Sequence, residues 1–167
     1  MLIYGRRNIN AIMKNNKIVF IRSVLVILIV SWCSLIFFMS HEPANVSSNR
    51  SGVLTNVLSS IFFFVERGIL EVIVRKTAHI FSYFVLSTLV SLLVNTYDFK
   101  NTLRYVISLS FTFLYAASDE IHQYFVVGRA CRMSDVMIDM IGGVGGALLV
   151  GFLMFIFKTK RNSQKEK

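Results

Sequence analysis

The chain has 167 residues, of which 54% are hydrophobic and 16% are charged, with one proline and a mean hydropathy of +0.61. Soluble proteins average about 25% charged residues, and a soluble domain of this length has too little interior to hide so much apolar surface. The composition therefore excludes a disordered chain, a disulfide-built secreted module and an ordinary cytosolic enzyme, and it predicts one integral membrane domain. The net charge of +9 is compatible with binding to nucleic acid, with binding to anionic lipid and with membrane topology. The positions of the charged residues along the chain must decide between them.

Four segments are apolar over about 20 residues, which is the length of helix that crosses a bilayer. In chain order they are residues 18–40, 77–95, 103–126 and 136–157. Basic residues precede the first segment, as in a signal peptide, but its apolar run is too long for one and no convincing cleavage motif follows. We therefore interpret it as a retained span and expect an all-α membrane fold, a four-transmembrane-helix bundle.

A fifth apolar stretch, Val53–Val74, is interrupted by charged residues, namely Glu66, Arg67 and Glu71. Charged residues such as Asp, Lys or Arg each cost about 2.5–3.5 kcal/mol at the centre of a membrane helix on insertion scales. Apolar side chains nevertheless recur along the stretch at helical spacing: Leu54, Leu58, Ile61, Phe62 and Val65. The pattern predicts an interfacial or re-entrant helix in the first outer loop, with a five-span topology as the alternative.

Basic residues gather in the segments that four spans would place on one side of the membrane. Twelve of the 18 Lys and Arg residues lie there, against only Asp98 and Glu166. The twelve are Arg6, Arg7, Lys14, Lys17, Arg22, Lys100, Arg104, Lys158, Lys160, Arg161, Lys165 and Lys167. The positive-inside rule then predicts a multi-pass membrane protein with both termini in the cytoplasm.

This orientation divides the chain into a basic cytoplasmic N-terminus (residues 1–17), a membrane domain (residues 18–157) and a basic cytoplasmic tail (residues 158–167). The basic ends are explained by topology and anionic headgroups. We expect membrane lipids as partners and no nucleic acid, because no aromatic–basic binding module accompanies the charges.

Polar and ionisable residues gather at three span ends that this orientation brings to the outer leaflet. They are Lys76, His79, Tyr83, Asp119, Glu120, His122, Gln123, Arg129, Arg132, Asp135 and Asp139. Residues near span ends also snorkel to headgroups or complement a helix dipole, but ionisable groups inside spans are costly and indicate function. The convergence predicts one outward-facing polar pocket.

Such a pocket could be one of three kinds of site. A metal site would need His79, His122 and a carboxylate, but no metal-ligand spacing supports it, so no metal ligand is assigned and the cofactor stays open. General acid/base catalysis would use Asp119, Glu120 and His122.

In that reading Lys76, Arg129 and Arg132 would hold an anionic group such as a phosphate. The remaining candidates would position the ligand or pair with the cations: His79, Tyr83, Gln123, Asp135 and Asp139. The third kind of site would bind a ligand through the same groups without catalysis. Sequence spacing does not separate the last two, so the question of an enzyme stays open.

Small residues recur along the fourth segment as Gly142-x-x-x-Gly146 and Ala147-x-x-x-Gly151. Such stripes let helix backbones approach closely. We favour packing against another span of the same chain over homodimerisation, and the oligomeric state stays open.

The polar residues also form a pattern that resembles the VanZ-like family over roughly residues 75–146. It consists of Lys76-x-x-His79-x-x-x-Tyr83, then Asp119-Glu120-x-His122-Gln123 with Gly128-Arg129, then Asp135-x-x-x-Asp139-x-x-Gly142. The resemblance implies a small multi-span bacterial membrane protein, and named members are associated with lowered susceptibility to teicoplanin.

The expected function is action at the outer leaflet on an anionic lipid or cell-wall precursor. The alternative is a non-catalytic membrane module that binds a lipid or a partner protein.

Overall fold

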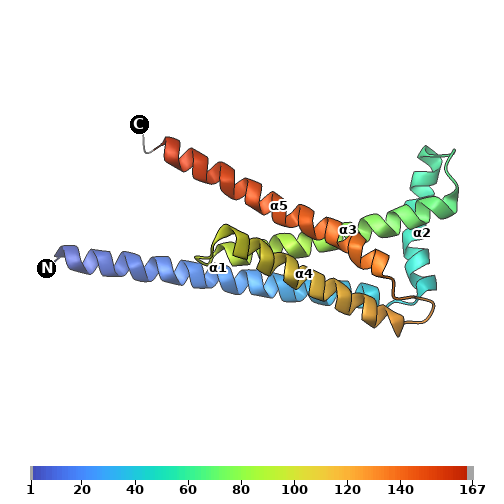
Figure 1. Ribbon diagram of the computed structural model, residues 1–167, viewed down its shortest axis with the longest axis horizontal. Coiled ribbons are helices and arrows are strands. Elements are labelled where there is room, and N and C mark those ends of the chain that lie inside the picture. Colours follow the sequence, from blue (N-terminus) through green and yellow to red (C-terminus); the bar gives the residue numbers. More distant parts are fainter. Residues whose placement is uncertain (1, 165–167) are drawn as a thin grey trace.

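The computed structural model describes residues 2–164, except for the side chains of residues 2–12, 14, 44, 50 and 161. Within residues 2–164 there are five helices and no strands: α1 (Leu2–Ser40), α2 (Ala44–Ile61), α3 (Arg67–Asn95), α4 (Asn101–Tyr124) and α5 (Met133–Ser163). Figure 1 shows the start of α1, the end of α5 and the α3–α4 connection toward one end of the molecule. The α1–α2 and α4–α5 connections lie toward the other end, so α1, α3, α4 and α5 run alternately in opposite directions.

In the described part of the chain, three helical stretches are long and apolar enough to cross a membrane: Asn15–Ser40, Arg67–Asn95 and Met133–Lys160. They contain the predicted spans 18–40, 77–95 and 136–157. The predicted span 103–126 corresponds to α4, which is not among the three, so a fourth crossing stays a prediction. Six cations used for the predicted orientation lie outside the described residues or side chains: Arg6, Arg7, Lys14, Arg161, Lys165 and Lys167.

The apolar stretch Val53–Val74 does not form the single helix that its periodicity predicts. Helix α2 ends at Ile61, residues 62–66 turn, and α3 begins at Arg67, ten residues before the predicted start of the second span. Of the charged residues in this region, Glu66 precedes α3, and Glu71 pairs with Arg75 one turn later in α3, at 3.2 Å. A helix does occupy the predicted first outer loop, and Figure 1 shows α2 lying crosswise to the other helices.

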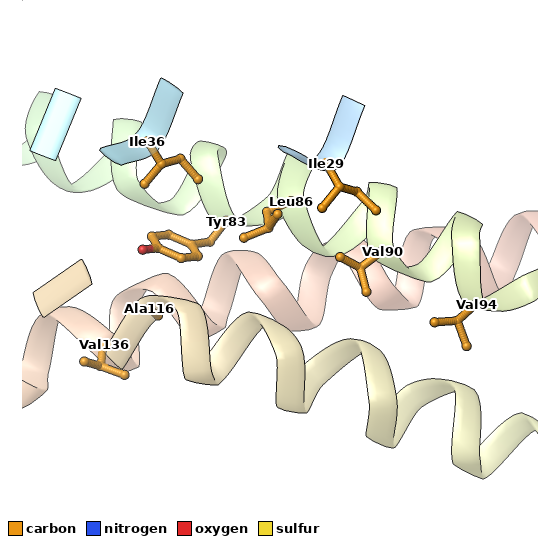
Figure 2. Close-up of a cluster of buried hydrophobic side chains, with 8 residues drawn as sticks. All are labelled: Ile29, Ile36, Tyr83, Leu86, Val90, Val94, Ala116 and Val136. Carbon is orange, nitrogen blue, oxygen red and sulfur yellow. The ribbon is translucent and has the colours of Figure 1, made fainter. Parts of the chain in front are cut away.

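The apolar core lies between α1, α3, α4 and α5. Figure 2 shows its buried side chains, which are Ile29, Ile36, Tyr83, Leu86, Val90, Val94, Ala116 and Val136. Leu86 and Tyr83, both fully buried on α3, are its largest members. The core therefore fixes α3 as the central helix of the bundle.

Helix α4 buries its polar side and exposes its apolar side. Its buried residues are Ser108, Thr112, Ala116, Asp119, Glu120 and Gln123. Leu114 and Ile121, by contrast, keep 66% and 60% of their surface exposed. A helix on the surface of a water-soluble protein shows the reverse pattern. The arrangement therefore favours an apolar surrounding for α4.

The glycine stripe of α5 packs against α3 of the same chain. A Cβ atom at Gly142 would collide with the main-chain carbonyl oxygen of Ile80, and one at Gly146 with that of Phe84. The prediction of intramolecular helix packing by this stripe is confirmed. The close approach matters for the site because Asp139 lies one turn before Gly142.

Replacement of Tyr115 by phenylalanine is expected to lower the stability of the fold by about 1 kcal/mol, the net contribution of a typical hydrogen bond. The Tyr115 hydroxyl donates to the carbonyl oxygen of Cys33 at 2.6 Å and so joins α4 to α1. Thermal unfolding in lipid nanodiscs measures the change. The control is Ser118→Ala, because the Ser118 hydroxyl donates only to a carbonyl of its own helix. Equal melting temperatures for both variants would contradict the prediction.

Candidate functional site

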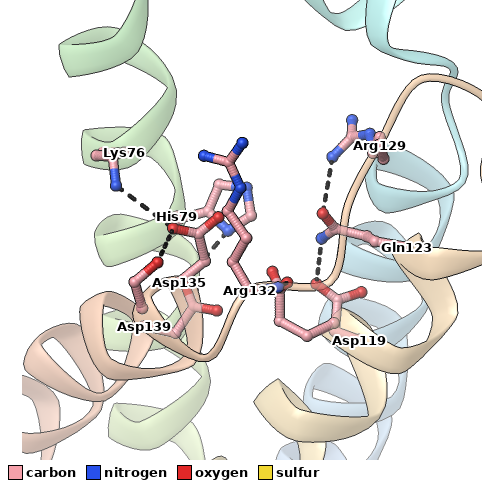
Figure 3. A network of polar contacts seen from close by, with 10 residues as sticks. Lys76, His79, Asp119, Gln123, Arg129, Arg132, Asp135 and Asp139 are labelled. Atoms are coloured by element: carbon pink, nitrogen blue, oxygen red, sulfur yellow. Dashed lines mark hydrogen bonds and ion pairs between the residues drawn. The ribbon is translucent and has the colours of Figure 1, made fainter.

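An ion pair and a histidine–carboxylate contact join the first half of α3 to the start of α5 (Figure 3). Lys76 Nζ lies 3.4 Å from Asp135 Oδ1, and His79 Nδ1 lies 3.2 Å from Asp139 Oδ1. Successive turns of both helices supply the two contacts, since the residues of α3 are three positions apart and those of α5 are four positions apart. The Asp139 side chain is fully buried, whereas His79 keeps a quarter of its side chain exposed.

A second chain of contacts joins α4 to the end of α1. Gln123 Nε2 donates to Asp119 Oδ2 at 3.1 Å, and Arg129 Nη1 donates to Gln123 Oε1 at 3.3 Å. Arg129 also donates from Nε to the carbonyl oxygen of Glu42 at 2.9 Å. Figure 3 shows Asp119, Gln123 and Arg129 in this order. The three side chains therefore hold the α4–α5 connection against the end of α1.

The backbone just before Arg129 makes this placement possible. Gly128 has a φ of 77°, in the left-handed region that favours glycine, and the chain turns there between α4 and α5. Half-burial and the like charge of Arg75 lower the pKa of Arg129 below its ordinary value. Arginine remains charged in proteins, so a cation is held at this position.

Glu120 has a different role in the geometry. Its side chain is almost fully buried, and Oε2 accepts a hydrogen bond from the main-chain N–H of Arg132 at 2.9 Å. The contact holds the backbone of Arg132, which directly precedes α5, and thereby fixes where the Arg132 side chain begins.

The larger of two neighbouring cavities, about 220 Å³, lies between the end of α1, α2, α3 and α4. Its apolar wall includes Ile36, Leu54 and Val74. Two guanidinium groups, those of Arg75 and Arg129, border it. The cavity therefore combines an apolar wall with two cations, and two carboxylate residues, Glu42 and Asp119, also border it.

The smaller cavity, about 130 Å³, lies between the beginnings of α3 and α5. Its polar and charged border consists of Arg75, Lys76, His79, Arg132, Asp135 and Asp139. Arg75 and His79 border both cavities. The structure thus divides the expected single pocket into two neighbouring cavities.

Most of the predicted site residues lie at these cavities. His79, Tyr83, Asp119 and Arg129 border the larger one. Lys76, His79, Arg132, Asp135 and Asp139 border the smaller one, and Gln123 bridges Asp119 and Arg129.

Two of the proposed catalytic residues lie elsewhere. Glu120 and His122 border neither cavity. His122 Nε2 lies 3.2 Å from His41 Nδ1, and its ring packs on Phe37 with 4.5 Å between the ring centroids. Among the described residues, no three His, Cys, Asp or Glu side chains are grouped so that they could hold a metal ion, and His79 and His122 do not share a site.

Arg75 borders both cavities but is not among the predicted site residues, although it directly precedes Lys76. Its Nη2 donates to Ser48 of α2 at 2.9 Å and to Glu71 at 3.2 Å. The spacing of four residues to His79 and eight to Tyr83 places it on the same face of the helix. This spacing is the feature of the sequence that indicates Arg75 as a site residue.

Comparison with known proteins gives one family. A family model described as VanZ/LLP1 matches residues 25–157, which include every site residue described above. Neither the curated proteins nor the solved structures contain a match to this chain.

Proposed function

The chain belongs to the VanZ/LLP1 family, and from this premise we propose that it binds the phosphate group of an anionic lipid or lipid-linked cell-wall precursor at the outer leaflet of the bacterial membrane. Helices of this length and hydropathy together with the family support a membrane protein. The phosphate occupies the larger cavity, between Arg75 and Arg129.

The observation that carries the proposal is a set of buried donors without acceptors at the larger cavity. Arg75 Nε and Ser40 Oγ are buried and have no hydrogen-bond partner among the described residues, and both residues border the cavity. An unpaired buried donor costs about 1–3 kcal/mol. A phosphate supplies acceptors to such donors and also neutralises the guanidinium groups, which hold oxyanions well because of their planar fork of donors.

The surroundings of the cavity support a ligand that comes from the membrane. Its apolar wall suits the first segment of a lipid chain, and α2 contributes Ser47, Ser51 and Leu54 to its lining. At the α2–α3 turn, Phe63 and Phe64 keep 86% and 74% of their surface exposed. We place α2 and this turn in the outer membrane interface, where amphipathic helices with exposed aromatic residues bind.

The positions of Glu120 and His122 favour binding without chemistry, because neither residue borders a cavity. Asp119 is the one member of the predicted acid/base group that borders the larger cavity. A protein that holds lipid-linked wall precursors would alter antibiotic access to them. We therefore propose that its expression lowers susceptibility to teicoplanin, as the family resemblance implies.

Lipid titration of the purified protein by native mass spectrometry tests the binding. We expect phosphatidylglycerol and phosphatidic acid to bind more tightly than phosphatidylcholine. Arg129→Gln is expected to weaken the binding of the two anionic lipids by at least about tenfold, since a hydrogen bond to a charged group contributes ~1.5–3 kcal/mol and ~1.4 kcal/mol is tenfold. Arg67→Gln is the matched control, because Arg67 is an exposed arginine on the same side of the bundle. Equal binding of all three lipids would refute the proposal.

A topology experiment tests the orientation and the fourth crossing. We expect green fluorescent protein to fluoresce when it is fused after Asp98 or after Lys167, and alkaline phosphatase to be active when it is fused after Gly128. The expectation rests on four crossings, with α4 between Asp98 and Gly128. If fusions after Asp98 and Gly128 report the same side, α4 does not cross the membrane.

A further inference from the structure

The two cavities are close enough to hold two parts of one headgroup, because Arg75 and His79 border both of them. The larger cavity offers unpaired donors, as described above. The smaller cavity offers the opposite feature, an unpaired acceptor. A ligand that spans both therefore needs an acceptor-rich group and a donor next to it.

Asp139 supplies this unpaired acceptor. Its side chain is fully buried and borders the smaller cavity. His79 Nδ1 lies 3.2 Å from Asp139 Oδ1, within hydrogen-bond distance. Asp139 Oδ2 has no hydrogen-bond partner among the described residues. A buried carboxylate oxygen is costly without a donor, and nearly all such groups in proteins have one. A donor on the ligand would satisfy Oδ2.

The charges around the smaller cavity decide what kind of donor fits. Three cations, Arg75, Lys76 and Arg132, border it against two carboxylates, Asp135 and Asp139. A ligand ammonium would meet a net positive border. A hydroxyl group fits better, since it donates to Asp139 and also accepts from a neighbouring cation.

The size of the smaller cavity agrees with this choice. Its volume of about 130 Å³ compares with the roughly 30 Å³ that a water molecule occupies in the liquid. A three-carbon polyol or one edge of a sugar ring is of this order. An extended polymer headgroup would have to continue into solvent.

We infer that the ligand is a polyol phosphate ester, whose phosphate lies in the larger cavity and whose hydroxyl group donates to Asp139 in the smaller one. The inference rests on the proposed function and adds the chemical class of the headgroup. Arg75 and His79 lie at the junction of its two parts. The polyol is either the glycerol of a phospholipid or the sugar of a sugar-phosphate lipid.

A comparison of two lipids tests the inference on the unmodified protein. Phosphatidylglycerol and phosphatidylpropanol carry the same phosphodiester charge, but only the first has headgroup hydroxyls. In nanodiscs we expect the protein to bind phosphatidylglycerol about tenfold more tightly. Equal binding of the two lipids would overturn the inference and leave the proposed function standing. If neither binds better than phosphatidylcholine, the proposed function itself fails.

The variant Asp139→Asn tests the residue. Asparagine keeps the shape, but with its amide oxygen toward His79 it places an NH2 donor where the accepting Oδ2 lies. We therefore expect the preference for phosphatidylglycerol to fall to less than twofold while phosphatidylpropanol binds as before. Asp98→Asn, in the α3–α4 connection, is the matched control. An unchanged preference, or an equal loss for both lipids, would overturn the role of Asp139. If the variant does not fold, the lipid comparison on the unmodified protein decides alone.

Soluble competitors identify the source of the polyol. Displacement of phosphatidylglycerol by glycerol 1-phosphate, more strongly than by N-acetylglucosamine 1-phosphate, assigns the site to a glycerophospholipid. The reverse order assigns it to a sugar-phosphate lipid. If inorganic phosphate displaces phosphatidylglycerol as well as both, hydroxyl recognition is absent and the inference is wrong.

Discussion

Replacing Gly142 by leucine is expected to separate α5 from α3 and to abolish the accumulation of folded protein. The first atom of the new side chain would collide with the carbonyl oxygen of Ile80, a main-chain atom inside a helix. Overpacking of side chains costs about 1–3 kcal/mol, and a collision with backbone costs more because a whole helix must move. The yield of monodisperse protein and its melting temperature in nanodiscs measure the effect.

The chain offers a matched control for this substitution in Gly52. A Cβ atom there would meet nothing within 4 Å, so Gly52→Leu is expected to leave the melting temperature within a few degrees of the unmodified protein. Gly142→Leu is also expected to disturb the site. Any folded fraction would have Asp139 shifted away from His79 and would bind lipid weakly. A Gly142→Leu protein with the stability of Gly52→Leu would contradict the packing of α5 on α3.

The crossing helices were predictable from the sequence where a long apolar run meets few charges. Spans 18–40 and 136–157 lie within stretches of α1 and α5 that have the length and hydropathy to cross a membrane. The break at residues 62–66 was not predictable, since that run is apolar and contains neither proline nor glycine. The contact that accompanies the break is tertiary, since Arg75 donates to Ser48 and so joins α3 to α2.

Helical spacing indicated which face each polar residue shares, but not which partner it meets. Lys76 and His79 were expected on one face, yet the pairing of His79 with Asp139 depends on the close contact at Gly142. The main-chain acceptors of Arg129, the carbonyl groups of Met39 and Glu42, have no signature in the sequence. Patterns of side chains therefore predicted the members of the site better than its geometry.

The position of His122 shows the same limit. Asp119 and His122 are three residues apart, so the helical spacing predicts that they lie on the same face of α4. Asp119 is buried in the bundle, whereas His122 meets His41 and Phe37 at the end of α1. Only the position of α1 separates the two residues, and a sequence motif does not contain it.

Substitution of Arg75 by glutamine is expected to cause the largest loss of binding among single changes at the site. Arg75 borders both cavities, and its buried Nε lacks an acceptor. Hydrogen bonds to charged groups contribute about 1.5–3 kcal/mol, so the dissociation constant for phosphatidylglycerol should rise about 10- to 100-fold. Arg75→Lys should restore little of it, because an ammonium group lacks the planar fork that contacts Ser48 and a phosphate together.

The same arginine also ties α2 to α3 through Ser48, and the two roles can be separated. Ser48→Ala removes this tie and leaves the guanidinium at both cavities, so we expect a less than twofold change in lipid binding. If Ser48→Ala weakened binding as much as Arg75→Gln, Arg75 would act by holding α2 in place. A large loss in Arg75→Gln alone would mean that its charge and donors contact the ligand, which is what a phosphate placed between Arg75 and Arg129 requires.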